Sequence, residues 1–377
     1  MSVLGLILFA GLKVLSPCDS IINAAIERED APGVVLLITK KDRVVYEKAY
    51  GIRSYLPEEE KMTVGTVFDL ASLSKCFGTT LAFMTLLEDK KVSLDDPVKK
   101  YIPDFEPWYD EADTVDITVR HLMTHSSGLF PVVYLDDFLA LYGENQPDSL
   151  KTFIAKTHPR LFRPGTDFKY SCPNFIVLQE ILETVTGEKL CDYAYRRIYA
   201  PMGLKSTMYL PLDREIPSRI KGRIAPTELL EDGTLLCGEV HDPTARLANN
   251  GNSGNAGLFS DARDLAALCS MIMNGGKYDG RRILKKKTIA LMEEVPYPEV
   301  GRALGWDTSS PHAWFEGGLS KHRCLCHTGY TGTSVVMDLD KKVAIILLAN
   351  RVHPTDEGGM GQARVEISNL VARTIAR

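Results

Sequence analysis

The chain has 377 residues, of which 45% are hydrophobic and 25% charged. This is ordinary usage for a globular protein, and it excludes a disordered, collagen-like or coiled-coil chain. The formal net charge of −5 leaves no basic excess to bind a phosphate backbone, so no nucleic acid partner is expected. The length suits one large domain or two interleaved ones.

The first twelve residues are uncharged and, apart from Ser2, apolar. They are too short to span a membrane, and neither a basic n-region nor an A-x-A cleavage site marks them as a secretory signal. We therefore expect them to begin a packed N-terminal helix that continues through Ile21, Ile22 and Ile26. This predicts a cytoplasmic protein without a transmembrane span; an extracytoplasmic location through an atypical N-terminal signal is the alternative.

A β-hairpin is the next predicted element. A mostly apolar run over 34–39 is followed by a turn at Lys41 and Asp42 and by a returning run over 44–49. Helical patterns then dominate from about residue 75 to about residue 294. The clearest of them cover residues 81–87, 175–185 and 265–273.

Strands return near the C-terminal end, between about residues 303 and 348. Runs over 335–338 and 343–348 flank a four-residue turn, and a last amphipathic helix covers about 362–375. The predicted strands therefore cluster at both ends of the chain and the helices in its middle.

This distribution predicts an α/β lobe joined to an all-α lobe. We expect residues 1–75 and 265–377 to build an antiparallel sheet flanked by helices, and residues 76–264 to form a mainly helical second lobe. Together they would form one interleaved catalytic unit, and a cleft between the lobes is the expected place for a site.

The eight cysteines include no C-x-x-C pair, and a chain of this length needs no disulfide scaffold. We expect most of them to be small buried hydrophobes. His121 and His125 are four residues apart, but no acidic residue lies between them as in H-E-x-x-H and no third ligand is evident. No metal and no cofactor is expected.

The candidate nucleophile is Ser72, in the S-x-x-K sequence that ends at Lys75. It opens an apolar run that favours a helix, where free N–H groups and the helix dipole stabilise developing negative charge. Lys75 lies on the same helical face, and burial would lower its pKa and let it take the serine proton. A second match, Ser218 to Lys221, lacks a helical context.

Two further elements carry candidate site residues. Tyr170 precedes Pro173, which suits the first turn of a helix, so its hydroxyl would lie on the entering loop and reach a cleft to shuttle protons. His327, Thr328, Gly329 and Tyr330 lie in a predicted strand near the C-terminal end. A substrate could approach closely at Gly329, and the Tyr330 N–H could join that of Ser72 in an oxyanion hole.

In this order the three elements resemble the serine β-lactamase and penicillin-binding-protein superfamily. The resemblance is to its class C β-lactamase-like branch, which includes carboxylesterases and D-aminopeptidases. It covers about residues 30 to 375 and extends to the stretches 120–129 (RHLMTHSSGL), 238–242 (GEVHD) and 255–260 (NAGLFS). It also makes His121 and His125 parts of a helix motif rather than metal ligands.

The resemblance implies a β-lactamase/transpeptidase-like fold and an acyl-enzyme mechanism on an ester, an amide or a β-lactam. Ser72 would attack the carbonyl, while Lys75 and Tyr170 would pass protons. The N–H groups of Ser72 and Tyr330 would hold the oxyanion, and water activated near Tyr170 would release the acyl group.

Two departures from the family pattern point to esterase-like rather than β-lactamase activity. Cys172 stands where the tyrosine motif usually has asparagine; Asn174 is the candidate to substitute, although its place along the helix start directs it elsewhere. His327 stands where β-lactamases carry lysine, and a neutral histidine attracts a substrate carboxylate less at pH 7.

Two alternatives stay open at this point. A binding or sensor protein for β-lactams or peptidoglycan fragments would keep the fold without turnover, and Cys172 motivates that reading. Acyl transfer to an alcohol or an amine would use the same intermediate as hydrolysis. An α/β-hydrolase is disfavoured, because the chain has no G-x-S-x-G sequence.

Overall fold

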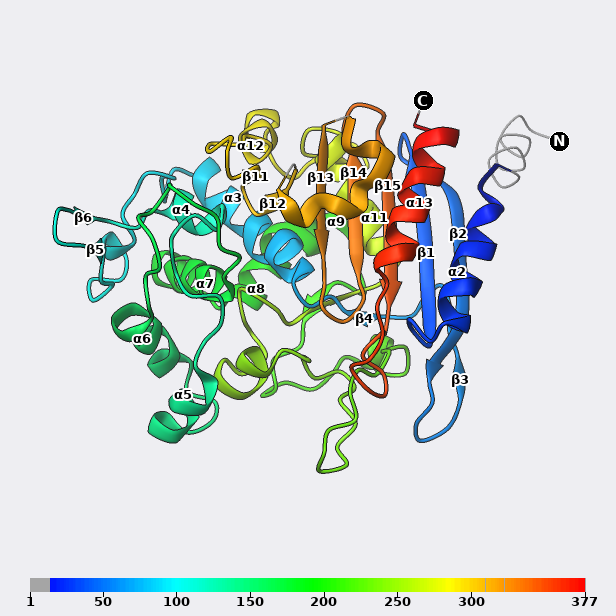
Figure 1. Cartoon of the computed structure of the whole chain (residues 1–377), viewed down its shortest axis with the longest axis horizontal. Coiled ribbons are helices and arrows are strands. Elements are labelled where there is room, and N and C mark those ends of the chain that lie inside the picture. The colour runs from blue at the N-terminus through cyan, green and yellow to red at the C-terminus, as the bar shows by residue number, and fades with distance from the viewer. Residues whose placement is uncertain (1–13, 309, 322, 377) are drawn as a thin grey trace.

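The computed structural model describes residues 14–308, 310–321 and 323–376. The segment 1–12, which we expected to begin the N-terminal helix, lies outside the described residues. An eight-stranded sheet forms one side of the molecule, and most of the helices form the other (Figure 1). Its strands run in the order β11-β12-β13-β14-β15-β1-β2-β3.

The strands of this sheet come from two distant parts of the chain. One group is β1 (Gly33–Lys40), β2 (Arg43–Ser54) and β3 (Glu60–Lys61). The other group is β11 (Arg302–Ala303), β12 (Trp306–Asp307), β13 (Cys324–Thr328), β14 (Ser334–Asp338) and β15 (Val343–Ala349). All of their pairings are antiparallel, and β1 pairs with β15 from Val34 opposite Ala349 to Lys40 opposite Val343.

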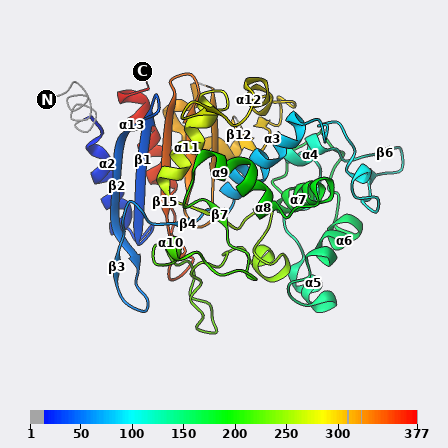
Figure 2. The same ribbon diagram turned by 180° about the vertical axis from the view of Figure 1, so that it is seen from behind.

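Helices cover both faces of the sheet, which explains why its central strands are apolar without alternation. On one face α2 (Pro17–Glu27) and α13 (Gly361–Thr374) pack on Val34, Leu36 and Ile38. On the other face α11 (Ala262–Met273) packs on β1 and β15, as seen from behind in Figure 2. Val35 and Leu37 of β1 join the large core on that side, together with residues of the helical part.

The helical part follows the first strands. Its longer helices are α3 (Leu81–Glu88), α5 (Leu135–Tyr142), α6 (Pro147–Thr157) and α7 (Cys172–Thr186). The shorter ones are α4 (Val119–Met123), α8 (Leu190–Ala194), α9 (Ala200–Met202), α10 (Ser218–Lys221) and α12 (Lys286–Met292), with π or 3₁₀ segments at 75–80, 98–100, 195–199, 244–248 and 311–321. Small strands accompany them: β5 (Trp108–Tyr109), β6 (Thr114–Val115), β9 (Lys277–Tyr278) and β10 (Arg281–Arg282), and the sheet β4 (Phe68–Asp69), β8 (Leu258–Ser260) and β7 (Met208–Tyr209).

The predicted elements are confirmed with shifted ends. The hairpin turn, the strands 335–338 and 343–348, and the helices at 81–87, 175–185, 265–273 and 362–375 all occur. One element differs: the helix that Ser72 was expected to open begins with the π-helical segment Lys75–Thr80 before α3. No helix in the described ranges is long and apolar enough to cross a membrane.

Candidate active site

Ser72 lies in a strained turn directly after β4. The residue before it, Ala71, has a φ of +47°, which non-glycine residues seldom adopt. The Asp69 carboxylate holds this turn, because its Oδ1 accepts the Ala71 N–H at 2.8 Å. Its Oδ2 accepts the N–H of His241 at 2.7 Å. The buried Asp69 therefore fixes the backbone that presents Ser72.

Lys75 is fully buried and donates to three acceptors from three segments. Its Nζ lies 3.0 Å from Ser72 Oγ, 2.9 Å from the Asn255 carbonyl oxygen and 3.5 Å from Cys172 Sγ. The expected contact between Ser72 and Lys75 is thus present. Three directed hydrogen bonds leave the amine little freedom, so it is oriented toward the serine before any substrate binds.

The predicted direction of the Lys75 pKa shift is wrong. Burial by itself lowers the pKa of Lys75, as expected, but the electrostatic interaction with Cys172 and Tyr170 raises it by more than burial lowers it. The sequence pattern predicted that Lys75 is buried, but it did not show which groups lie beside it. Burial raises the pKa of the Tyr170 phenol as well, against the positive charge of Lys75. Both groups therefore hold their protons at neutral pH.

Tyr170 lies just before α7, and its hydroxyl is buried at the Lys75 end of the site. The Lys75 Nζ is 5.1 Å from the centre of its ring. His125 holds the residues on either side of it: the Lys169 N–H donates to the His125 carbonyl at 3.0 Å, and the Ser171 N–H donates to His125 Nδ1 at 3.1 Å. The two rings pack with centres 4.4 Å apart, so His125 positions Tyr170 rather than a metal.

The sequence left open whether Cys172 or Asn174 takes the place of the asparagine in the tyrosine motif. Cys172 occupies the expected asparagine place and contacts Lys75. Asn174 points away from the cavity, as its position on the helix predicted. Its amide donates to His125 Nδ1 at 3.0 Å, and its carbonyl oxygen accepts the Ser127 hydroxyl at 2.5 Å. Asn174 thus supports His125 instead of the substrate.

The third motif packs against the Ser72 turn. Thr331 Oγ1 donates to the Asp69 carbonyl at 2.7 Å, and Thr333 Oγ1 donates to the Leu70 carbonyl at 3.0 Å. A Cβ on Gly329 would lie 2.4 Å from the Leu70 carbonyl oxygen and 2.1 Å from Thr333 Oγ1. Our reason for Gly329 is therefore corrected: the glycine admits the protein's own chain rather than a substrate.

His327 is buried behind Tyr170 and does not reach the cavity that Ser72 opens into. Its ring centre is 5.9 Å from that of Tyr170, and its Nδ1 lies 2.8 Å from the Thr328 carbonyl. Burial lowers the pKa of His327 to about 3, so the imidazole is neutral. Thr328 ends β13 opposite Ser334 and also lies outside the lining of the cavity.

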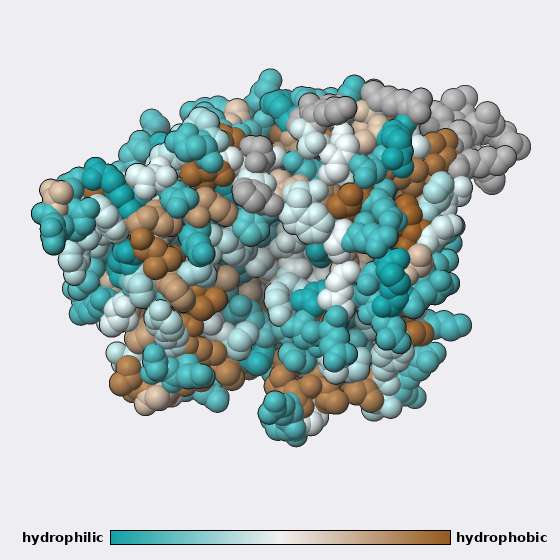
Figure 3. Space-filling view, in the orientation of Figure 1, coloured by the Kyte–Doolittle hydropathy of each residue, from teal (hydrophilic) through white to brown (hydrophobic). Residues whose placement is uncertain are grey.

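A cavity of about 530 Å³ lies over Ser72. Tyr170, Cys172 and Tyr330 line it together with apolar residues, which are Pro131, Val132, Pro243 and Ala256, and with charged residues, which are Glu228, Asp242, Arg246 and Asp356. Exposed hydrophobic side chains continue from Val132 into α5, and Figure 3 shows such residues gathered over the helical side of this face. The cavity therefore offers mainly apolar contact next to the serine hydroxyl.

The two expected oxyanion donors are the backbone N–H groups of Ser72 and Tyr330. Within the described residues, neither the Ser72 N–H nor the Tyr330 N–H donates to a backbone carbonyl. The Tyr330 side chain is held outward, with its hydroxyl on Asp356 and its ring stacked on His241 at 5.7 Å. Tyr330 therefore lines the cavity beside the hydrogen-bonded pair of His241 and Glu228.

Several site residues were missed by sequence reasoning. Asp69, Asn255 and His125 contact the catalytic candidates or their turns, and Arg246 lines the cavity. Asp69 had a signal of its own, because a carboxylate between apolar Phe68 and Leu70 predicts a buried charge that is paired. His125 and Asn255 lie in stretches that carried the family resemblance, but their individual roles did not follow from it. The others act through single atoms that no spacing rule connects to Ser72.

Comparisons with known proteins identify the family and the fold of the chain. The model of the Beta-lactamase family matches residues 18–368. A protein named "Putative D-alanyl-D-alanine carboxypeptidase" from Escherichia coli (strain K12) is 33% identical over 353 residues, which is 85% of this chain and 79% of that protein. The solved structure of EstCE1, described as a hydrolase with promiscuous acyltransferase activity, has a TM-score of 0.73 at 25% identity and covers 96% of this chain and 99% of that one.

A further solved structure shows the fold alone. It is the octameric penicillin-binding protein homologue from Pyrococcus abyssi, with a TM-score of 0.70 at 23% identity, covering 96% of this chain and 79% of that one. These likenesses confirm the expected fold class, an antiparallel sheet flanked by helices with a helical second part.

Proposed function

The chain belongs to the β-lactamase family, and from this premise we propose that it is a serine hydrolase that cleaves carboxylic esters through an acyl-enzyme on Ser72. The observation that carries the assignment of the nucleophile is the 3.0 Å contact between Lys75 Nζ and Ser72 Oγ at the floor of the cavity. A serine hydroxyl is a weak nucleophile unless a base beside it takes its proton.

The reaction follows from the groups around Ser72. Once Tyr170 or Lys75 has lost a proton, that group accepts the proton of Ser72, and Ser72 Oγ attacks the ester carbonyl carbon. The N–H groups of Ser72 and Tyr330 stabilise the resulting oxyanion. The bond to the leaving alkoxy oxygen then breaks, and this oxygen takes a proton from the same pair. Water repeats the sequence on the acyl-enzyme and releases a carboxylic acid.

Esters are favoured over β-lactams because of what the cavity wall holds. A β-lactam substrate carries a carboxylate, yet His327 is neutral and buried behind Tyr170, and the carboxylates of Glu228, Asp242 and Asp356 line the cavity alongside Arg246. The wall around Ser72 is mainly apolar, which suits an uncharged acyl group. The description of EstCE1 as a hydrolase with promiscuous acyltransferase activity supports hydrolysis by way of an acyl group and makes an alcohol a second acceptor to test.

One observation favours a second candidate, cleavage of a peptide that ends in a free carboxylate. Arg246 lines the cavity, and its Nη1 donates to the carbonyls of Val240 and His241, which holds the guanidinium in place. A guanidinium is suited to bind a carboxylate. The name of the relative from Escherichia coli points to such a substrate.

The first test compares Ser72→Ala with Ser218→Ala. Both serines belong to an S-x-x-K sequence, and Ser218, contrary to our expectation, also begins a helix, α10. Ser218 is nevertheless exposed and lies away from the cavity. We expect a fluorophosphonate probe to label the wild type and Ser218→Ala once per chain, as read by intact-protein mass. We expect hydrolysis of p-nitrophenyl butyrate to fall at least about 1000-fold in Ser72→Ala.

The outcomes separate the readings. Labelling without turnover of any ester would favour the sensor alternative. A larger kcat/KM for a cephalosporin than for the ester would contradict the ester assignment, and a larger value for a D-alanyl peptide would favour the second candidate. Activity that survives in Ser72→Ala would overturn Ser72 as the nucleophile.

A further inference from the structure

The loop of residues 249–255 supplies one of the three hydrogen-bond acceptors of Lys75. Its last residue, Asn255, presents the carbonyl oxygen that lies 2.9 Å from Lys75 Nζ. This loop is not an element of regular structure, so side-chain contacts decide where that carbonyl lies. The orientation of Lys75 toward Ser72 therefore depends on what holds the loop.

Gln179 on α7 holds the loop with all of its hydrogen-bonding capacity. Its Oε1 accepts the Gly254 N–H at 2.9 Å and the Asn249 amide at 3.0 Å. Its Nε2 donates to the Asn252 carbonyl at 2.7 Å and to Glu183 at 3.0 Å. The side chain is only 1% exposed, so an unpaired amide here would carry a full desolvation cost.

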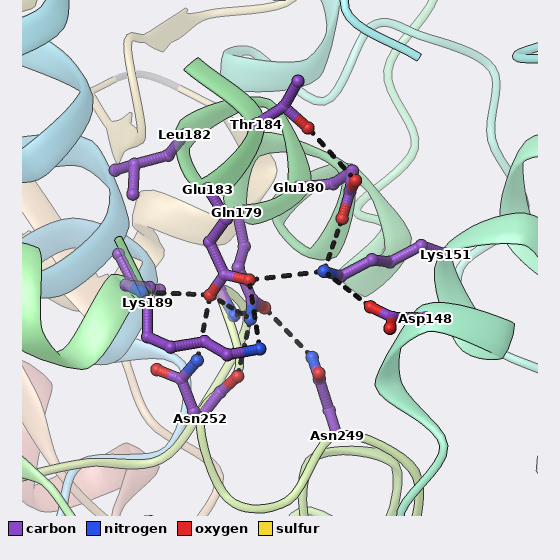
Figure 4. Close-up of polar contacts among 12 residues, drawn as sticks. Asp148, Lys151, Gln179, Glu180, Leu182, Glu183, Thr184, Lys189, Asn249 and Asn252 are labelled. Atoms are coloured by element: carbon purple, nitrogen blue, oxygen red, sulfur yellow. Dashed lines mark hydrogen bonds and ion pairs between the residues drawn. The ribbon is translucent and has the colours of Figure 1, made fainter. Parts of the chain in front are cut away.

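Glu183, one turn further along α7, braces the same contact (Figure 4). Its carboxylate accepts from Gln179, from the Asn252 side-chain amide at 3.0 Å and from the Leu190 N–H at 2.9 Å. Lys151 lies 3.3 Å from its other oxygen. These bonds fix the Gln179 rotamer, so the amide is a rigid clamp rather than a mobile one.

The loop is held from its other side by the helix that carries Lys75. Thr79, four residues after Lys75, donates from Oγ1 to the Gly254 carbonyl at 2.7 Å. A Cβ on Gly254 would lie 1.9 Å from the Phe175 carbonyl oxygen, which shows how closely the loop packs on α7. Gly254 is thus tied through its N–H to Gln179 and through its carbonyl to Thr79, directly before Asn255.

We propose that Gln179 is a positioning residue for the reaction: by clamping Gly254 it sets the Asn255 carbonyl that holds Lys75 against Ser72. This inference rests on the proposed function, because it assigns Gln179 a part in that chemistry. Gln179 touches neither the substrate cavity over Ser72 nor the reacting atoms. Its effect would therefore fall on the rate of acyl transfer and not on the binding of the ester.

The test uses Gln179→Met, which keeps the bulk of the side chain and removes its four hydrogen bonds. The matched control is Glu180→Gln, the next residue on α7, whose carboxylate contacts Lys151 and Thr184 but not the loop. Active sites are counted by fluorophosphonate labelling, so that kcat refers to folded enzyme. We expect kcat to fall about tenfold in Gln179→Met with KM changed less than about twofold, and no such split in Glu180→Gln.

A double-mutant cycle with Thr79→Val adds a readout that a purely structural role would not move. If both residues act through Gly254, the fold-loss of kcat in the double variant is smaller than the product of the fold-losses in the two single variants. A kcat per labelled site that stays at the wild-type value in Gln179→Met would overturn the inference, whatever the loss of stability. So would independent, multiplicative losses in the cycle.

The failure of this inference can be distinguished from the failure of the proposed function. If wild-type protein hydrolyses no ester yet is labelled at Ser72, the proposed function fails. The rate constant of labelling then replaces kcat, and an equal rate for the wild type and Gln179→Met would overturn the inference.

Discussion

At the scale of single residues, catalysis depends on two neighbouring groups that both hold a proton at neutral pH. Lys75 and Tyr170 lie together beside Ser72, and both have a pKa above the usual range. For Tyr170 the main cause is burial; for Lys75 the opposing effect of burial is outweighed by Cys172 and Tyr170. A pair that keeps both protons at neutral pH must lose one before it can accept the proton of Ser72.

We therefore predict that activity rises with pH. A general base acts only when it is deprotonated, and a raised pKa means that the base becomes protonated, and inactive, at a higher pH. Below that pKa the rate falls about tenfold per pH unit. The measurement is kcat/KM for p-nitrophenyl butyrate from about pH 6 to about pH 9, corrected for spontaneous hydrolysis. Tyr170→Phe should lose most of the activity across the range. A profile with its maximum on the acidic side of neutrality would contradict the assignment.

At the scale of elements, the first hairpin shows how a turn is made from residues that do not favour it. Lys41 and Asp42 both have positive φ, +49° and +64°, which is the conformation of a two-residue hairpin turn that prefers asparagine and glycine. Asp42 makes stabilising contacts, because its Oδ1 accepts hydrogen bonds from Ser270 on α11 and from Asn274 just after that helix. The exposed side chain of Lys41 has no such contact in the described structure.

Replacing Lys41 should therefore stabilise the protein. Lys41→Asn relieves the cost of a left-handed backbone at a non-glycine residue, and we expect a gain of about 0.5 to 1 kcal/mol in the free energy of unfolding. Denaturant unfolding monitored by circular dichroism measures it. Arg43→Asn, an exposed position in β2 just outside the turn, is the control and should bring no gain. A loss of stability in Lys41→Asn would show that the turn is not strained.

At the scale of the whole molecule, the sheet joins parts of the chain that are about 300 residues apart. Ile346 in β15 lies opposite Leu37 of β1 and opposite Val335 of β14, and all three are fully buried. The strand β14 leads back through Thr331 and Thr333 to the turn that presents Ser72. The integrity of the site is thus tied to the pairing of the two chain ends.

This connection predicts that the sheet and the active site unfold together. Ile346→Ala leaves a cavity on the face of the sheet that α11 covers and should lower the free energy of unfolding by about 2 to 5 kcal/mol, and Ile346→Val by about 1 kcal/mol. The thermal midpoints of circular dichroism and of fluorophosphonate labelling should shift by the same amount. Labelling that is lost well before the sheet would indicate that the site unfolds on its own.

Much of the local structure could be predicted because it depends on neighbours in the sequence. The hairpin follows from two apolar runs around a turn, and the start of α7 from Pro173. The contact of Ser72 with Lys75 follows from their spacing of three residues on a helical turn. The division into lobes at 75/76 and 264/265 stays a prediction, as does the cytoplasmic location.

The remainder was decided by tertiary structure, because it depends on atoms that are distant in the chain. Lys75 meets Cys172 and Asn255 only when three segments converge, and those neighbours reversed the pKa shift that burial alone predicts. Gly329 makes room for the Leu70 carbonyl, and His327 lies behind Tyr170. The sequence motif that contains Gly329 and His327 predicts neither of these arrangements. A spacing rule fixes which side chains share a face; electrostatics and close packing depend on every group that the fold brings within a few ångströms.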